Sequence, residues 1–381
     1  MFKKQPIDVA AYIWPAYTGD EPRSRIFWPE GIGEWESVKN STRKTPDYHW
    51  KRKPLWGYVN EADPRVMEME INAAADHAVN VFIYDWYWFD RRPFLEQCLD
   101  NGFLKAENRD RMKFFVMWAN HNANYVWDKR NSDMPNAWET IVWRGDVDRK
   151  EFEVIGHRLI DNYFHQPNYY TIDGKPVFML YNMGNLISGL GGERHVVEAF
   201  DWLREEAVRS GLPGLHLLGI PLRSKKPNLS GVDDPYKSLQ ISSMAEFGMD
   251  SSTDYSFAQF ANPGRDYLEI LPDVQEEWRK LEKNCGVPYI PHVTIGWDNN
   301  PRFREFHDGA IMRNNTPENF EKGLLMAKEY LLKKPSVPQM VTINSWNEWT
   351  ETSYLQPDDL YGYGYLEAVK KVFGKKPEIS P

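Results

Sequence analysis

The sequence predicts an α/β fold, a single (β/α)8 TIM barrel with long strand-to-helix loops. Short, continuously apolar runs occur eight times and alternate with amphipathic stretches, as the strands and helices of a barrel do. Long segments rich in Trp, Asn, Asp and Pro follow the runs, such as residues 16–62 and 121–147, whereas the link 79–80 into a run is short. No Gly/Ser-rich linker marks a boundary, so residues 1–381 are expected to form one domain.

The apolar runs are expected to be the barrel strands. Most of them are continuously hydrophobic and do not alternate with polar residues, which favours parallel strands buried on both faces. The sixth run has the weakest strand character. The eight runs are residues 9–14, 81–87, 114–119, 177–181, 215–220, 252–257, 289–295 and 340–343.

Helices are expected between the strands, and two of them have a clear start signal. Asp63-Pro64 and Thr316-Pro317 each place a capping side chain directly before a proline, which suits the first turn of a helix. Gly248 is expected to end the fourth helix. The expected helices are residues 63–78, 148–164, 193–210, 235–247, 263–284, 316–332 and 363–373.

Composition excludes several classes of protein. A formal net charge of -9 argues against a nucleic-acid binder, and no apolar run approaches the roughly 18 residues that cross a membrane. Asp8 interrupts what would be the apolar part of a signal peptide, so the chain as written is expected to be cytoplasmic, or periplasmic or secreted if an export signal has been removed. Cys98 and Cys285 are expected to be buried and unpaired. No feature specifies an oligomeric state.

Two acids at the end of the eighth run are the candidate catalytic residues. Glu348 and Glu351 lie in Trp346-Asn347-Glu348-Trp349-Thr350-Glu351, where a barrel strand opens into its loop. Hydrolysis of a glycosidic bond needs one carboxylic acid to protonate the leaving oxygen and a second carboxylate as base or nucleophile. The pair converges only if the strand ends by about Trp346. The alternative is that both are solvated loop charges between packed tryptophans.

Aromatic and hydrogen-bonding side chains gather at the other strand ends. The chain contains 16 Trp, 20 Tyr and 19 Phe, and a planar apolar face at a strand end suits a sugar ring. Half of the aromatics of the second and third runs are expected to pack in the core, because side chains alternate along a strand. Arg302 is expected to pair with Asp298 or with an acidic sugar. The candidate substrate-binding residues are Tyr12, Trp14, Asp85, Tyr87, Trp88, Trp118, Asn120, His121, Tyr181, Tyr255, Trp297, Asp298, Arg302, Asn344, Trp346, Asn347 and Trp349.

Signals for a cofactor or metal are weak, and none is expected. Asp146-Val147-Asp148 formally matches the Asp-x-Asp that holds the metal of a nucleotide sugar, but Asp148 is expected to cap a helix. Residues 189–192 contain glycines without the spacing of a phosphate-binding loop, and the histidines lack the spacing of a zinc site.

The same segments resemble the WbsX-type proteins, described by association as glycosyltransferases, and their relative glycoside hydrolase family 99, the endo-acting α-mannosidases and α-mannanases. The resemblance covers nearly the whole chain, and its most specific part is the segment from Trp346 to Glu351. The other segments that carry it are Val9-Ala10-Ala11-Tyr12, Gly33-Glu34-Trp35, Tyr84-Asp85-Trp86-Tyr87-Trp88-Phe89, Trp118-Ala119-Asn120, Trp297-Asp298-Asn299-Asn300-Pro301-Arg302, Tyr354-Leu355-Gln356-Pro357-Asp358 and Tyr363-Gly364-Tyr365-Leu366.

The resemblance implies a barrel fold and a role for each acid. Glu348 would take a proton from the sugar's own 2-hydroxyl, which attacks C1, and Glu351 would protonate the leaving oxygen, with retention of configuration. The expected function is therefore hydrolysis of an α-glycosidic bond in a polysaccharide or glycan. A glycosyltransferase of surface-polysaccharide synthesis and a non-catalytic carbohydrate-binding barrel are the alternatives. The strand ends around the acid pair are similar to WbsX-type proteins, so mannose specificity is not implied.

Overall fold

The fold is the predicted α/β barrel. The computed structural model describes residues 6–42, 52–225, 239–306 and 310–374. Eight parallel strands run in the order β12-β9-β8-β4-β2-β1-β14-β13, so β1 lies between β2 and β14. The strands are β1 (Asp8–Ile13), β2 (Val81–Phe89), β4 (Lys113–Trp118), β8 (Lys175–Leu180), β9 (His216–Gly219), β12 (Ser251–Ser252), β13 (His292–Thr294) and β14 (Met340–Asn344).

The barrel closes between β12 and the segment that leads into β13. The backbone N–H of Ile290 donates to the carbonyl of Ser252 at 2.8 Å, and the N–H of Ser252 donates to Pro288 at 2.9 Å. β12 has only two residues, so the expected strand at 252–257 is wrong beyond Ser252. The chain continues into a 3₁₀ helix (Phe257–Gln259) that Ser256 caps. This short strand brings the next residues over the barrel mouth.

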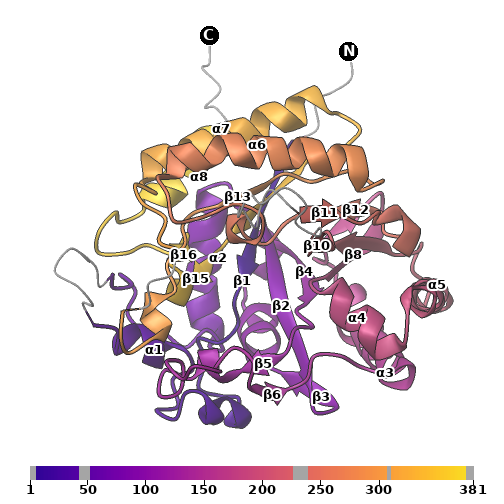
Figure 1. The fold of residues 1–381 in the computed structure, drawn as a ribbon, viewed down its shortest axis with the longest axis horizontal. Coiled ribbons are helices and arrows are strands. Elements are labelled where there is room, and N and C mark those ends of the chain that lie inside the picture. The colour runs from indigo at the N-terminus through magenta and orange to yellow at the C-terminus, as the bar shows by residue number, and fades with distance from the viewer. Residues whose placement is uncertain (1–5, 43–51, 226–238, 307–309, 375–381) are drawn as a thin grey trace.

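Helices cover the outside of the barrel (Figure 1), with α6, α7 and α8 along one side and α3, α4 and α5 along another. Asp63, Asp148 and Thr316 cap their helices through the side chain, as predicted. The helices are α1 (Trp35–Lys39), α2 (Pro64–Asp76), α3 (Arg149–Leu159), α4 (Met183–Leu190), α5 (Glu193–Arg209), α6 (Tyr267–Asn284), α7 (Pro317–Lys333) and α8 (Gly364–Phe373).

The helix expected at 235–247 is wrong in the part that the structure describes. Residues 235–238 lie outside the described residues, and β11 (Leu239–Ile241) pairs antiparallel with β10 (Arg223–Lys225). A single 3₁₀ turn (Ala245–Phe247) follows. Gly248 ends this turn in the left-handed conformation, with φ 74°, so the stop signal was correct although the helix before it was not.

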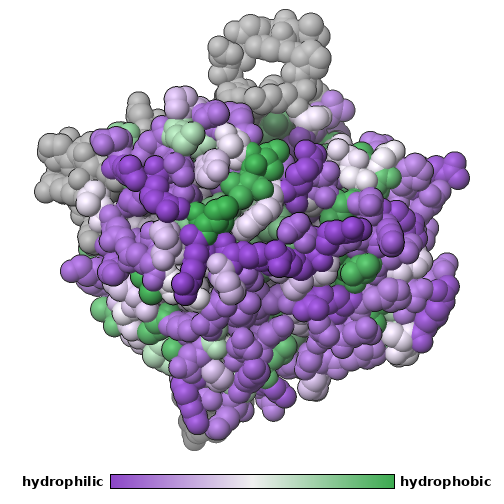
Figure 2. Space-filling model, turned by 90° about the horizontal axis from the view of Figure 1, so that it is seen from below, coloured by the Kyte–Doolittle hydropathy of each residue, from purple (hydrophilic) through white to green (hydrophobic). Residues whose placement is uncertain are grey.

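The carboxyl ends of the strands point toward β3 (Arg92–Phe94), β5 (Ala123–Asn124) and β6 (Ile141–Trp143), at the lower edge of Figure 1. Seen from that side, the surface is mainly hydrophilic, and its apolar groups are small and separated (Figure 2). Cys98 and Cys285 are buried and unpaired, as expected. Among the described residues, no helix has the length and apolar character to cross a membrane.

Candidate active site

A pocket of about 550 Å³ opens where the barrel strands end. Its walls combine aromatic rings with carboxylates and amides, and its residues come from the ends of β1, β2, β4, β8, β12, β13 and β14 and from the loops that follow them. The lining residues are Trp14, Asp85, Tyr87, Ala119, His121, Asn122, Asn124, Val126, Trp127, Trp138, Glu139, Ile141, Tyr181, Asn182, Tyr255, Trp297, Arg302, Glu348 and Glu351.

The two candidate catalytic acids face this pocket from the loop after β14. The strand ends at Asn344, and Glu351 closes a 3₁₀ turn (Trp349–Glu351), so the condition for the pair to converge is met. The loop is held by buried bonds: the backbone N–H of Glu348 donates to Ser345 Oγ at 2.7 Å, and that of Trp349 donates to the Tyr17 hydroxyl at 3.0 Å. Glu348 is 2% exposed, so the solvated-charge alternative does not describe it.

Arg302 joins the two acids and a third one. Its Nη2 donates to Glu348 at 2.9 Å, its Nη1 to Glu351 at 2.7 Å and its Nε to Glu34 at 3.2 Å. Each guanidinium nitrogen therefore contacts a different carboxylate, and all four side chains are largely buried. The expected pairing of Arg302 with Asp298 is wrong, because these three nearer acids take its nitrogens.

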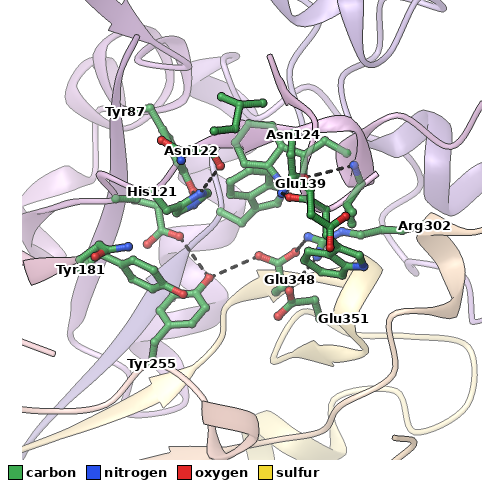
Figure 3. A pocket seen from close by; sticks show the side chains of 18 of the residues that line it. Tyr87, His121, Asn122, Asn124, Glu139, Tyr181, Tyr255, Arg302, Glu348 and Glu351 are labelled. Atoms are coloured by element: carbon green, nitrogen blue, oxygen red, sulfur yellow. Dashed lines mark hydrogen bonds and ion pairs between the residues drawn. The ribbon is translucent and has the colours of Figure 1, made fainter. Parts of the chain in front are cut away.

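Tyr255 connects Glu348 to a further acid, Asp85, and Figure 3 shows the contact between Tyr255 and Glu348. The Tyr255 hydroxyl lies 3.1 Å from Asp85 Oδ2 and 3.5 Å from Glu348 Oε2. Burial raises the pKa of Asp85 well above its usual range. Burial also raises the pKa of Glu348, the charge of Glu351 raises it further, and the charge of Arg302 opposes both.

Two carboxyl oxygens of the pocket have no hydrogen-bond partner in the described part of the protein. They are Asp85 Oδ1 and Glu351 Oε2, and both are shielded from solvent. Buried polar atoms normally form hydrogen bonds. These two oxygens at the pocket wall can therefore accept hydrogen bonds that the protein itself does not supply. In the same pocket, burial lowers the pKa of His121, and the charge of Arg302 adds to this, so the imidazole is neutral at pH 7.

The structure brings ten of the nineteen sequence-predicted residues into the pocket lining. Their roles in binding and catalysis stay predictions. They are Trp14, Asp85, Tyr87, His121, Tyr181, Tyr255, Trp297, Arg302, Glu348 and Glu351. The other nine lie outside the lining and have structural contacts, for three different reasons.

Trp88 and Trp118 lie on strand faces that point away from the pocket. Tyr87 faces the pocket, so the alternation along β2 turns Trp88 outward, where its Nε1 donates to Glu151 of α3 at 2.7 Å. Trp118 packs against Phe152 of the same helix. Both rings belong to the layer between strands and helices.

Three residues of the loop that contains Glu348 and Glu351 point away from the pocket. Trp346 Nε1 donates to Glu70 Oε2 at 2.8 Å, and Asn347 Nδ2 donates to Glu61 at 2.9 Å. Trp349 stacks on Tyr354, with ring centroids 3.7 Å apart. These side chains hold the loop in place and do not reach the pocket.

The remaining four residues lie beneath or beside the pocket. The Tyr12 hydroxyl donates to the Asp254 carbonyl at 2.9 Å, below Tyr255. Asn120 exchanges bonds with the backbone of residue 182 at 2.7 and 2.8 Å. Asp298 accepts from the backbone and side chain of residue 300 at 3.0 and 2.8 Å, and Asn344 is fully buried at the end of β14.

Sequence reasoning missed several residues that shape the site. Glu34 was noted only as part of a resembling segment, although it is fully buried and bonded to Arg302. The loop between β4 and α3 contributes Trp127, Trp138 and Glu139 to the pocket. The length and Trp content of this loop were the available signals.

The Asp-x-Asp motif has structural partners. Asp146 accepts from Arg144 at 2.8 Å, and Asp148 caps α3 by accepting from the Glu151 N–H at 2.8 Å. Within the described ranges, no group of three or more His, Cys, Asp or Glu side chains is arranged to hold a metal ion.

The fold and the site together define an α/β barrel protein with a pocket of carboxylates and aromatic rings at the carboxyl ends of its strands. Similar solved structures include a glycoside hydrolase-like protein, 16% identical at a TM-score of 0.60, with 98% of this chain and 95% of that chain covered. The glycoside hydrolase family 99 endo-α-mannosidase from Bacteroides thetaiotaomicron is 14% identical at a TM-score of 0.56, with 96% of each chain covered. At these identities the likeness shows the fold.

The chain belongs to the family described as Glycosyltransferase WbsX, which it matches over residues 9–369. The uncharacterized protein WxcX of Xanthomonas campestris pv. campestris is 24% identical over 382 residues, which cover 98% of this chain and 51% of that protein. The chain thus spans about half the length of the curated relatives it matches. The predicted resemblance to the WbsX-type proteins and to family 99 is confirmed.

Proposed function

We propose that the chain is a glycoside hydrolase that cleaves an α-glycosidic bond in a polysaccharide or glycan with retention of configuration. The observation that carries the proposal is the acid pair: Glu348 and Glu351 face one pocket and share the guanidinium of Arg302. The rings of Trp14, Trp127 and Trp297 give that pocket apolar walls, which suit the C–H faces of a sugar.

The proposed reaction uses the sugar's own 2-hydroxyl as nucleophile. Glu348 takes the hydroxyl proton while O2 attacks C1, and Glu351 gives a proton to the departing glycosidic oxygen. Water then opens the strained O2–C1 bond, Glu351 takes a proton from the water, and Glu348 returns a proton to O2. The arrangement supports these roles, because Arg302 contacts both carboxyls and Tyr255 and Thr350 orient Glu348.

The test is turnover of a panel of α-linked polysaccharides by the Glu348→Gln and Glu351→Gln variants. Each is expected to lower kcat by about 10² to 10⁴, because each removes one proton-transfer step. Glu107→Gln is the matched control, since its carboxylate is exposed. Near-normal activity of both pocket variants, or products of inverted configuration by NMR, would contradict the proposal.

A substrate with an activated leaving group distinguishes the proposed base, Glu348, from the proposed acid, Glu351. Glycosyl fluorides of the sugar that the panel identifies leave without protonation, so they are expected to restore turnover to Glu351→Gln but not to Glu348→Gln. A 2-deoxy substrate lacks the attacking hydroxyl and is expected to be inert with the wild-type chain. Cleavage of the 2-deoxy substrate would remove the proposed route and leave hydrolysis itself standing.

The family description favours a second candidate, a glycosyltransferase. A transferase would bind a nucleotide sugar, and calorimetry with nucleoside diphosphates, with and without manganese, tests this. Binding without hydrolysis of any glycan would favour the transferase. Glycan binding with neither hydrolysis nor nucleotide affinity would instead indicate a carbohydrate-binding barrel.

A further inference from the structure

The charges around the pocket restrict which sugars it accepts. Arg302 is the one Lys or Arg side chain among the described residues of the lining, and Glu34, Glu348 and Glu351 already surround it. A guanidinium bonded to three carboxylates has no net positive field to offer to an anionic ligand. The sequence-based expectation of an acidic sugar at Arg302 therefore loses its physical basis.

The rest of the lining adds negative charge. Asp85 lies across the pocket with its Oδ1 unpaired, and Glu139 is exposed at the rim, where it pairs with no Lys or Arg of the described residues. His121, the remaining titratable base, is neutral at pH 7 because burial lowers its pKa. Arg302 requires at least one ionised carboxylate beside it in this buried setting, and Glu139 adds another. The lining thus has no net positive charge.

We propose that this pocket selects glycans that are uncharged or carry an amino group, and rejects glycans that carry carboxylate, sulfate or phosphate at the cleaved linkage. The inference rests on the proposed function, because it concerns the sugar bound at Glu348 and Glu351. Glu139 acts as a charge filter at the mouth, and deeper in the pocket the unpaired Asp85 Oδ1 accepts a hydrogen bond from a hydroxyl or amino group. The aromatic walls have no net charge and their faces favour cations, so they add no attraction for an anionic glycan.

The experiment compares three derivatives of whichever panel glycan the wild-type chain cleaves fastest. The glycan is converted to the same degree into a carboxymethyl ether, the methyl ester of that ether and an aminoethyl ether. The methyl ester matches the carboxymethyl group in bulk and lacks its charge. We expect kcat/KM for the carboxymethyl form to be at least about tenfold below the methyl ester, and the aminoethyl form to equal or exceed the ester.

Two further readouts tie the effect to charge at the named residues. The difference between the carboxymethyl form and its ester is expected to shrink as salt rises from about 0.02 to 0.5 M. Glu139→Lys is expected to raise kcat/KM for the carboxymethyl form part of the way to that of the ester, and Glu139→Gln is expected to raise it by a smaller amount. Equal kcat/KM for the charged and esterified forms in the wild-type chain would overturn the proposal.

Failure of the proposed function is distinguishable from failure of this inference. If no panel glycan is cleaved, the hydrolase proposal fails, and binding of the same derivatives is measured by calorimetry. Weaker binding of the carboxymethyl form than of its ester then supports the charge selection without hydrolysis. Equal binding of the two forms, or no binding of any derivative, overturns it.

Discussion

At the scale of single residues, three carboxylates share one guanidinium, and Asp85 adds a fourth acid to the same pocket. One positive charge does not neutralise four carboxylates, and burial raises the pKa of Glu34, Glu348 and Asp85, which favours a mixed state of ionised and protonated carboxyls. Acid–base hydrolysis needs this mixed state, with one carboxylate ionised and one carboxylic acid protonated. Glu34 influences that balance without lining the pocket.

Glu34→Gln is expected to shift the pH dependence of activity. The charge of Glu34 raises the pKa of Glu348, so its removal lowers that pKa. If Glu348 is the base, it is active when ionised, and the acidic limb of the kcat/KM profile moves to lower pH. The profile is measured beside Glu36→Gln, a neighbouring acid on α1 that does not contact Arg302. An unmoved limb would show that Glu34 does not act on Glu348.

Glu70 is expected to make stability depend on pH. Burial raises its pKa from 4.5 to about 7, so the folded chain binds this proton more tightly than the unfolded chain. The protonated Glu70 carboxyl therefore contributes its full stabilisation of the fold below pH 4.5, and this stabilisation is lost as the pH rises to about 7.

Glu70→Gln keeps an acceptor for Trp346 and removes the ionisation. We expect the free energy of unfolding to increase by up to about 3 kcal/mol near pH 8, with little change near pH 4.5. Urea melts at both pH values measure this, with the exposed Glu107→Gln as control. If the free energy of unfolding increased equally at the two pH values, the effect would come from packing and not from the ionisation of Glu70.

At the scale of elements, the side chain of Asp148 caps helix α3, and its removal tests both the stability of the protein and its activity. Asp148→Ala is expected to lower the free energy of unfolding by about 1 kcal/mol, because α3 loses the acceptor for the Glu151 N–H. Its kcat is expected to be unchanged, since Asp148 lies outside the pocket lining. Thermal melts and assays with and without manganese check both. A manganese-dependent loss of kcat would revive the metal interpretation of the Asp-x-Asp motif.

Local signals determined which elements were predictable. The pairs Asp63-Pro64 and Thr316-Pro317 act within one helical turn, and both helices start as expected. The segment 239–241 is too short for periodicity to distinguish a strand from a helix, and its pairing with residues 223–225 is a tertiary contact. The sixth strand ends at Ser252 and a 3₁₀ helix begins at Phe257, and no local pattern in the sequence indicates this end.

The site residues that could be predicted are those that directly follow a predicted strand. Glu348 and Glu351 follow the last strand directly, so position and residue type sufficed to place them at the mouth. Tyr87 and Trp88 are equally aromatic, and only the register of β2 decides that Tyr87 faces the pocket. Glu34 reaches Arg302 from a distant loop, so its role depends on tertiary folding.

At the scale of the whole molecule, residues 1–381 are predicted to unfold as one unit. The eight parallel strands of the barrel include β1 and β14, which are far apart in the sequence, and one hydrophobic core extends from Val9 to Val372. Calorimetry is expected to show a single cooperative transition, with the calorimetric and van't Hoff enthalpies equal. Two separated transitions would indicate two independently folding parts and would contradict the single domain.

The position of β1 between β2 and β14 also has a consequence for synthesis. The ribosome releases β1 before the other strands of the sheet, yet Asp8 pairs with Met340, so one edge of β1 has no partner until β14 has emerged. Glu348 and Glu351 are made later still. A nascent chain therefore exposes an open strand edge while the residues between β1 and β14 are made, a situation in which chaperones protect against aggregation.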